Sequence, residues 1–268
     1  MGREIMSKVM NSLKRYPGIK KMHDVYCSVL WFIKKMLFRM RGATCHSCVS
    51  YNVNLVKALE TAKVQSDFSD HLSTVFYFAA ESNPKLIVEL GTLSGESTRA
   101  LLAAASISNA TVLSVDIGDC SHLNLAYRDR WHFIQADDVE FGKCSFEGWC
   151  LNQSIAPVID VLFIDTSHLY EHTVNEIEVW FKYLSDEATI IFHDTNLGAG
   201  IYSRTDGSIG CSWDNERGVI RAIEEFLGRQ YNEKTYFCDI TDNYSIMHFP
   251  NCCGLTIIRK RKRGQMSS

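Results

Sequence analysis

The sequence of 268 residues lacks an apolar segment long enough to cross a membrane as a helix. Its longest apolar run extends from Val25 to Ile33, includes Ser28, and falls far short of the roughly 20 residues that a span requires. The first residues also lack the compact apolar core and small-residue cleavage site of a secretory signal. Internal repeats and low-complexity segments are absent. These absences argue against an integral membrane protein and a repeat array, and they predict a cytoplasmic location.

A second metal-binding pair is missing from the cysteine pattern. The chain has ten cysteines without even spacing, and Cys45 and Cys48 form one C-x-x-C motif with no other pair at zinc-finger spacing. Cys252 and Cys253 lie far away in the sequence. We therefore expect buried or free thiols in a reducing compartment, rather than a disulfide framework or a structural zinc site.

The net charge is only −3, but the charged residues are unevenly distributed. Residues 1–45 contain ten Lys or Arg and two acidic residues, and residues 259–263 are five consecutive basic residues. The remainder carries thirteen basic and twenty-nine acidic side chains, which disfavours nucleic-acid binding by the body of the chain. The basic ends have two interpretations, which are contact with an anionic membrane or nucleic acid, and simple solvation.

Apolar residues in the segment 24–41 recur with helical periodicity beside four Lys or Arg. This pattern predicts an amphipathic helix that packs against the protein or a second subunit, or that lies on a membrane surface. We expect packing against protein, so that a homo-oligomer through the N-terminal helices is one prediction and peripheral membrane contact is the alternative.

The residues that indicate chemistry begin with a glycine turn between residues 86 and 98. The apolar run Leu86–Leu90 predicts a strand, and an alanine- and leucine-rich helix starts directly after the turn. Glycine allows the backbone to come close to a ligand, and the free N–H groups of a helix start favour polar or anionic groups. The predicted cofactor contacts of this turn are Glu89, Gly91, Thr92, Gly95 and Ser97.

A second strand ends at Asp116, twenty-five residues after Gly91. A carboxylate in that place accepts hydrogen bonds from a ribose diol, which predicts a cofactor that contains a nucleoside. A dinucleotide site requires G-x-G-x-x-G, whereas this turn has G-x-x-x-G preceded by Glu89, which suits a cationic amino-acid group. At this point the chain resembles the class I S-adenosylmethionine (SAM)-dependent methyltransferases. A nicotinamide site and a turn without any ligand are the alternatives.

Strand and helix patterns alternate through the rest of the chain. We expect helices over 68–82, 95–107, 170–184 and 216–228, a helical or irregular stretch over 138–151, and strands over 86–90, 111–116, 131–135, 159–164 and 188–193. Asp67 or Ser69 is expected to cap the helix 68–82. The alternation predicts an α/β fold with a Rossmann-like, doubly wound and mostly parallel sheet and helices on both faces.

Two late strands, 235–240 and 254–259, have a polar segment between them and predict an antiparallel edge of the sheet. The resemblance to class I methyltransferases implies the same ending, because their last strand runs against the others. The chain is thus divided into a basic helical N-terminal extension (1–67), a methyltransferase domain (68–260) and a basic, polar tail (261–268).

Acidic residues follow two further apolar strands. Asp165 ends the run Val161–Ile164, with His168 three residues later, and Asp194 ends the run Ile190–His193. Neighbouring parallel strands bring both carboxylates to one edge, where they repel each other unless a cation or proton lies between them. Magnesium accepts oxygen ligands in that geometry and would lower the pKa of an acceptor hydroxyl, and His168 would then take the proton as general base.

Together with the glycine turn, the Asp-x-x-His and Phe-His-Asp-Thr segments resemble the metal-dependent small-molecule O-methyltransferases. This branch includes antibiotic sugar O-methyltransferases and the family named after cephalosporin hydroxylase, and the resemblance covers roughly residues 68–259. It implies that Asp165 and Asp194 bind metal and that His168 is the base. Thr195 stands where relatives often place a second oxygen ligand, and it is the third predicted ligand. Without a metal, Asp165 would contact substrate or cofactor, Asp194 would cap the following loop, and His168 would be a solvated residue at a helix start.

The third strand leads to Asp137 and Asp138, either of which can accept a hydrogen bond from an adenine amino group. We favour Asp137 and expect the other residue to be a helix cap, while His172 and His193 are expected to be structural. The segment 196–216 has no clear periodicity, and such long loops at the carboxyl end of a sheet are often functional. We expect it to cover the acceptor through Tyr202, Arg204 and Trp213, and a disordered surface insertion is the alternative.

The sequence therefore predicts an enzyme that transfers a methyl group from SAM to a hydroxyl of a small molecule or sugar, with Mg²⁺ as a second expected cofactor. One alternative is an NAD-dependent oxidoreductase. The other is a non-catalytic protein that binds the cofactor and docks on a membrane or a protein through its basic ends.

Overall fold

The computed structural model describes residues 68–197, 201–203, 209–211 and 217–261. Several predictions lie outside these residues, namely the N-terminal extension, its amphipathic helix, the C-x-x-C motif, and the tail beyond residue 261. The predicted oligomer contact and membrane contact depend on the same segments, and they remain predictions. None of the described helices is long and apolar enough to cross a membrane.

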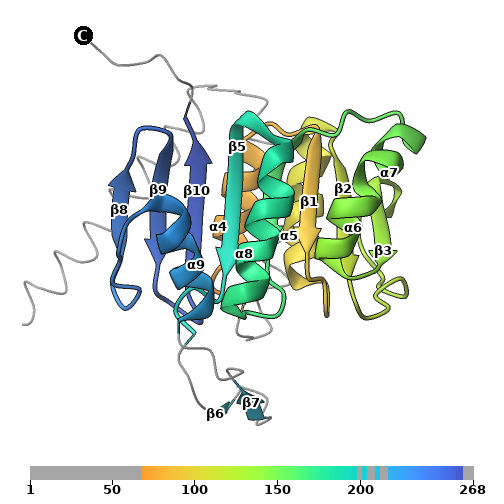
Figure 1. Cartoon of the computed structure of the whole chain (residues 1–268). Helices are drawn as coiled ribbons and strands as arrows, with labels where there is room; N and C mark the ends of the chain where they lie inside the picture. Colours follow the sequence, from red (N-terminus) through yellow and green to blue (C-terminus); the bar gives the residue numbers. More distant parts are fainter. Residues whose placement is uncertain (1–67, 198–200, 204–208, 212–216, 262–268) are drawn as a thin grey trace, which may run out of the picture. The chain divides into compact units, whose positions relative to one another are not determined.

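The described residues form an eight-stranded sheet with the order β3-β2-β1-β4-β5-β10-β9-β8 (Figure 1). Its first five strands pair in parallel, whereas β10 pairs antiparallel with β5 and β9, and β8 pairs antiparallel with β9. The strands are β1 (Leu86–Leu90), β2 (Thr111–Asp116), β3 (Trp131–Gln135), β4 (Ile159–Ile164), β5 (Leu184–His193), β8 (Phe237–Ile240), β9 (Tyr244–Phe249) and β10 (Leu255–Lys260). The predicted α/β, Rossmann-like and mostly parallel sheet is therefore confirmed.

Helices cover both faces of this sheet (Figure 1), which explains why its central strands are mostly apolar and buried. Leu86, Val88 and Leu90 of β1 pack with residues of α6, α8 and α9, whereas Ile87 packs with residues of α4 and α5. The side chains of β1 thus alternate between the two faces of the sheet, with the two-residue period of a strand. The helices are α4 (Leu72–Glu81), α5 (Glu96–Ser108), α6 (Asp138–Cys144), α7 (Phe146–Asn152), α8 (Tyr170–Trp180) and α9 (Gly218–Leu227).

The C-terminal edge is antiparallel, as predicted, but it contains a third strand that was not predicted. The segment between the two predicted late strands contains β9, so β8 and β10 each pair with β9 rather than with one another. A tight turn leads from β8 into β9, and in it the Thr241 N–H donates to the Tyr244 carbonyl over 2.8 Å. Ile246 and His248 of β9 are buried. A half-buried strand therefore lies within the segment that was described as polar from its composition.

Element ends differ where tertiary packing decides them. The predicted helix 170–184 stops at Trp180, a 3-10 turn occupies Phe181–Tyr183, and β5 already begins at Leu184. Helix α4 begins at Leu72 after His71, which provides no side-chain cap, so Ser69 is not the cap residue and Asp67 lies outside the described residues. In the predicted acceptor loop, β6 (Ile201–Ser203) pairs with β7 (Ile209–Cys211), while Arg204 and Trp213 also lie outside the described residues.

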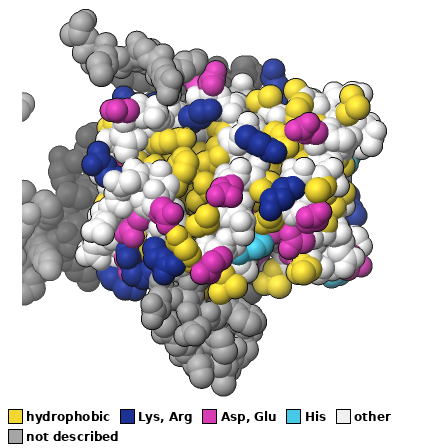
Figure 2. All heavy atoms as spheres, viewed as in Figure 1, with side chains coloured by type: hydrophobic (Ala, Val, Ile, Leu, Met, Phe, Trp, Pro, Cys, Tyr) yellow, Lys and Arg dark blue, Asp and Glu magenta, His cyan; other side chains and the backbone are white. Residues whose placement is uncertain are grey.

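The face covered by α8 and α9 presents basic and acidic side chains interspersed with apolar ones (Figure 2). Charges of both signs are therefore present on this face. The expected absence of nucleic-acid binding remains a prediction.

Candidate active site

A cavity of about 670 Å³ opens at the carboxyl ends of β1, β2, β4 and β5. Its volume lies within the range of small-molecule sites, and its place in the sheet is where open α/β folds bind ligands. Most predicted site residues line it, and they come from five separate segments of the chain: Gly91, Thr92, Ser97, Asp116, Asp137, Asp165, His168 and Asp194. Three predicted residues do not line it, and these are Glu89, Gly95 and Thr195.

Both glycines of the turn adopt a left-handed conformation. Gly91 has φ of 85° and Gly95 has φ of 76°, which glycine adopts without strain. A Cβ at Gly91 would lie 1.9 Å from the backbone oxygen of Asp165, so this glycine is required by the adjacent strand end rather than by a ligand. A Cβ at Gly95 would meet Leu123 at 2.8 Å, which also makes it a packing position.

The Glu89 carboxylate does not lie in the cavity, contrary to its predicted contact with the cofactor. Its side chain is fully buried behind the turn and points toward the start of α5. Ser97 and Thr98 donate to it over 2.7 Å and 2.8 Å, and Ser114 donates from the neighbouring β2. Burial raises the pKa of Glu89 to about 7, although these hydroxyls act in the opposite direction. Glu89 therefore ties together β1, β2 and α5 beneath the cavity.

Asp116 lies at the predicted end of β2 and lines the cavity. Its Oδ2 accepts from the backbone N–H groups of Thr92 and Leu93 at 2.7 Å and 3.0 Å, and its Oδ1 accepts from Gly118 N–H at 2.7 Å. A carboxylate offers about four acceptor directions, so acceptor capacity remains for a hydroxyl in the cavity. Asp116 thus fixes the turn and presents a charged group to the same space.

Of the two aspartates after β3, the one favoured as the adenine contact is also the helix cap. Asp137, the favoured adenine contact, caps α6 by accepting from the Glu140 N–H over 2.8 Å. Asp138 is buried, and its Oδ1 lies 3.0 Å from His172 Nε2. Both residues still line the cavity, but the one expected to be only a cap belongs to a side-chain cluster.

Asp165, His168, His193 and Asp194 converge at the ends of β4 and β5. His168 Nε2 lies 3.3 Å from Asp165 Oδ1 and 2.8 Å from Asp194 Oδ2, so it bridges the two carboxylates. On the other side, His193 Nδ1 lies 3.3 Å from Asp165 Oδ1 and 3.5 Å from Asp194 Oδ1. The predicted convergence of the carboxylates is present, and His193, which was expected to be merely structural, contacts both of them.

The charges of this cluster follow from its geometry. Burial alone would lower the pKa of His168, but the hydrogen bonds that its Nε2–H donates to Asp165 and Asp194 outweigh this effect and raise the pKa to about 10. The pKa of Asp194 is held well below its usual range, because the charges of His193 and His168 outweigh the effect of burial. At neutral pH, His168 is therefore an imidazolium between two carboxylates. In this state it cannot serve as the predicted general base.

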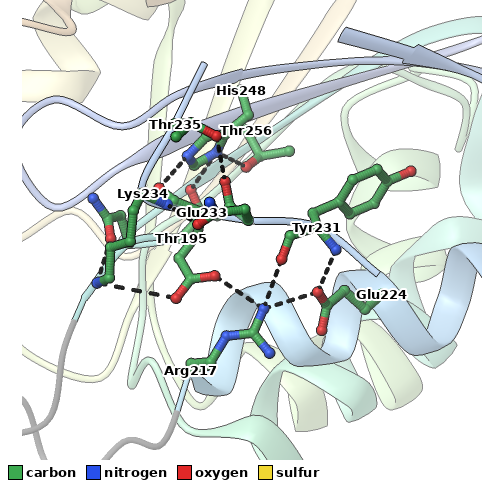
Figure 3. Close-up of polar contacts among 11 residues, drawn as sticks. Thr195, Arg217, Glu224, Tyr231, Glu233, Lys234, Thr235, His248 and Thr256 are labelled. Carbon is green, nitrogen blue, oxygen red and sulfur yellow. Dashed lines mark hydrogen bonds and ion pairs between the residues drawn. The ribbon is translucent and has the colours of Figure 1, made fainter. Parts of the chain in front are cut away.

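Thr195 faces away from the cavity and does not serve as the predicted metal ligand. It is buried, and its Oγ1 lies 3.4 Å from Nδ1 of His248 on β9, a contact drawn in Figure 3. Nε2 of His248 donates to the Glu233 carbonyl at 2.9 Å, so Nδ1 is the acceptor. The left-handed conformation of Asp194, with φ of 57°, turns the chain so that consecutive side chains diverge.

Arg217, at the start of α9, belongs to the same polar region as Thr195 (Figure 3). Its Nη2 lies 2.8 Å from Glu224 Oε1 and 3.0 Å from Glu233 Oε2, and it donates to the Tyr231 carbonyl at 3.1 Å. This arginine therefore joins α9 to the segment before β8.

Residues 88–195 match a protein family described as "Methyltransferase domain". No curated protein matches the sequence.

Three solved structures are similar to the chain at low identity. The SAH-bound methyltransferase PaMTH1 of Podospora anserina is 14% identical, with a TM-score of 0.47 over 78% of this chain and 88% of that chain. An O-methyltransferase of Bacillus cereus in complex with SAH is 14% identical, with a TM-score of 0.48 over 78% and 91%. The O-methyltransferase TomG of Streptomyces achromogenes, in complex with SAM, is 15% identical, with a TM-score of 0.49 over 78% and 90%. No functional assignment depends on similarities of this size. Residues 88–195, which include the central strands and the cavity-lining turn, are thus similar to a family of methyltransferase domains, in agreement with the resemblance stated from the sequence.

Proposed function

We propose that this protein transfers a methyl group from SAM to a hydroxyl of a small molecule or sugar. The observation that carries this proposal is the presence of two constellations in one cavity. The glycine turn with Asp116 lies on one side, and the cluster of Asp165, His168 and Asp194 lies on the other. The first suits the nucleoside of a methyl donor, and the second suits an acceptor hydroxyl.

The cofactor would lie across the ends of β1 and β2. Asp116 would accept hydrogen bonds from the ribose diol with the capacity that its backbone contacts leave free. Leu93 and Ile117 line the cavity and are 84% and 79% exposed, so they offer apolar surface to a planar base. The nearby Asp137 or Asp138 remains the candidate acceptor for an exocyclic amino group. Because Glu89 lies behind the turn, it supports the cofactor site indirectly.

A divalent cation fits part of the second constellation. One ligand atom each from Asp165, His168 and Asp194 lie within 4.8 Å of one another, and two carboxylates supply the oxygens that Mg²⁺ prefers. Thr195 adds none, because its hydroxyl is directed at His248. A cation held by Asp165 and Asp194 would neutralise the carboxylates and lower the pKa of an acceptor hydroxyl.

His168 determines how the proton leaves the acceptor. In the structure its Nε2–H is directed at Asp194 Oδ2 and Asp165 Oδ1, and these contacts keep it protonated. Once the carboxylates are otherwise neutralised, the pKa of His168 falls and Nε2 becomes a proton acceptor within the cavity. His193 then maintains the orientation of both carboxylates through Nδ1. Alignment of the hydroxyl with the donor methyl would provide a further rate contribution.

Calorimetric titration of SAM into the full chain tests the cofactor half of the proposal. We expect micromolar binding to wild type, at least 10-fold weaker binding to Asp116→Asn, and unchanged binding to Asp119→Asn. The control removes a fully exposed carboxylate three residues further along the chain. Binding of NAD but not SAM would overturn the proposal in favour of a nicotinamide enzyme, and binding of neither would leave a protein without this cofactor.

The acceptor half needs a turnover assay with a panel of hydroxylated small molecules and sugars. His168→Gln should lower the rate of methyl transfer by about 100-fold while SAM affinity stays within about 2-fold. Removal of divalent cations with EDTA should lower the rate in wild type. SAM binding without product from any acceptor would favour the non-catalytic alternative.

A further inference from the structure

A second cluster of metal-ligating side chains lies between α6 and α8, beside the cavity. It consists of Asp138 from α6 and of His172 and Glu176 from α8, whose ligand atoms lie within 4.8 Å of one another. His172 Nε2 is 3.0 Å from Asp138 Oδ1 and 3.6 Å from Glu176 Oε1. A contact of Asp138 with the cofactor would not explain His172 and Glu176, and the acceptor cluster includes none of the three residues.

Two carboxylate oxygens of the cluster have no partner among the described residues. They are Asp138 Oδ2 and Glu176 Oε2, and both are inaccessible to solvent. The Glu176 side chain is fully buried and Asp138 is only 7% exposed. The other oxygen of Glu176 accepts a hydrogen bond from Thr166 Oγ1 at 2.6 Å, which orients the carboxylate. A buried carboxylate oxygen without a donor is costly, so something must neutralise it.

We propose that Asp138, His172 and Glu176 bind a divalent transition-metal cation. One imidazole nitrogen and two carboxylates suit such an ion, of which Mn²⁺ is a convenient example. Ligands at about 2.1 Å from a metal are roughly 3.0–3.4 Å apart when their angle at the metal is near 90–109°. The distances of 3.0 Å and 3.6 Å from His172 Nε2 to its two partners are close to that range.

The electrostatics of the cluster favour a positive occupant. Burial raises the pKa of Glu176 well above its usual range, and the charge of Asp138 adds to the effect. The hydrogen bond to Asp138 raises the pKa of His172. The two carboxylates and the imidazole thus lie close together in a buried place, where a cation or a proton shared by Asp138 and Glu176 relieves the negative charge. A cation bound by the three side chains would fix Asp138 in the cavity wall.

Titration of the metal-depleted full-length protein with MnCl₂, followed by the electron paramagnetic resonance signal of free Mn²⁺, tests this site. Glu176→Gln keeps the shape of the side chain, and His172→Gln changes a partly exposed residue that is less important for folding. Each substitution should lower the affinity for one Mn²⁺ equivalent by at least about 10-fold. Asp137→Asn changes the neighbouring carboxylate that caps α6, and it should leave this Mn²⁺ affinity unchanged.

Asp194→Asn separates this site from the acceptor cluster. It should leave the proposed Mn²⁺ equivalent intact, whatever it does to the metal expected at Asp165 and Asp194. Circular dichroism of the metal-free variants identifies any that fail to fold, and His172→Gln then decides the result. Wild-type Mn²⁺ affinity in both cluster variants would overturn the proposal. Failure of the wild-type protein to bind this Mn²⁺ equivalent would also overturn the proposal. That result would indicate that the two carboxylates share a proton.

Discussion

Replacement of Glu89 by Gln tests how the glycine turn is supported. The Glu89 side chain is fully buried, and its carboxylate accepts hydrogen bonds from Ser97, Thr98 and Ser114. Burial raises its pKa from an ordinary value of 4.5 to about 7, even though the three hydroxyls act in the opposite direction. Glutamine has nearly the same shape and does not titrate, so the substitution isolates the cost of ionising this carboxyl group.

The sign of the effect follows from proton linkage. A carboxyl whose pKa is raised on folding stabilises the protein below its unfolded pKa, and this contribution disappears as pH rises through the folded pKa. For Glu89 the window extends from 4.5 to about 7. Wild type should therefore lose about 2–3 kcal/mol of unfolding free energy through this group between about pH 5 and about pH 8. The stability of Glu89→Gln relative to wild type should rise by the same amount.

Urea unfolding followed by circular dichroism, at several pH values across this range, measures the difference. Because other titrating groups are shared by the two proteins, their contributions cancel in the comparison. Glu178→Gln, on the exposed side of α8, controls for the substitution itself. A difference between Glu89→Gln and wild type that stays constant with pH would refute the reasoning, because it would show that the buried carboxyl does not titrate in this window.

Two further substitutions test the packing of the turn and the direction of Thr195. Gly91→Ala should lower the free energy of unfolding by about 3 kcal/mol, since its Cβ would lie 1.9 Å from the Asp165 carbonyl oxygen, whereas Gly148→Ala meets nothing within 4 Å and should be neutral or slightly stabilising. Equal unfolding midpoints for these two variants would contradict this account. Thr195→Val should leave Mg²⁺ affinity, measured by calorimetry, unchanged because its hydroxyl contacts His248, whereas Asp194→Asn should weaken it at least 10-fold. Loss of Mg²⁺ affinity in the threonine variant would restore Thr195 as a ligand.

In the parallel half of the sheet, strands β1, β2 and β4 were predictable because they are short, mostly apolar runs that are largely buried. The strands β1, β2, β3 and β4 have the predicted limits. The antiparallel edge was harder to predict, since β9 alternates between buried and partly exposed residues and includes His248. Its buried positions become recognisable only when β10 is in place beside it.

The direction of Glu89 illustrates what residue type alone does not determine. The alternation of β1 puts Leu86, Val88 and Leu90 on the side of α8, so Glu89 shares the opposite face with Ile87. That face meets the first turn of α5, where Ser97 and Thr98 donate to the carboxylate. The two-residue period of the strand therefore predicts the observed direction of the Glu89 side chain. The expected contact with a cationic ligand led to the opposite prediction.

The protonation of His168 could not be derived from the sequence. The Asp-x-x-His spacing predicts that Asp165 and His168 are close, and they are. The high pKa also requires Asp194, which arrives from the next strand and lies 2.8 Å from the same nitrogen. A histidine beside one carboxylate can accept a proton from a substrate, whereas one between two carboxylates holds its own. The catalytic role thus depends on a tertiary contact.

The different contacts of Asp137 and Asp138 follow from helix geometry. The first residue of such a pair stands at the N-cap, where its side chain reaches a backbone N–H one turn later, as Asp137 does with Glu140. The next residue is rotated by about 100° around the helix axis and faces a different neighbour. For Asp138 that neighbour is α8, with His172 and Glu176 one turn apart on the facing side. Two consecutive carboxylates at a helix start therefore separate into a cap and a cluster member, and the cluster member is the one placed to bind a cation.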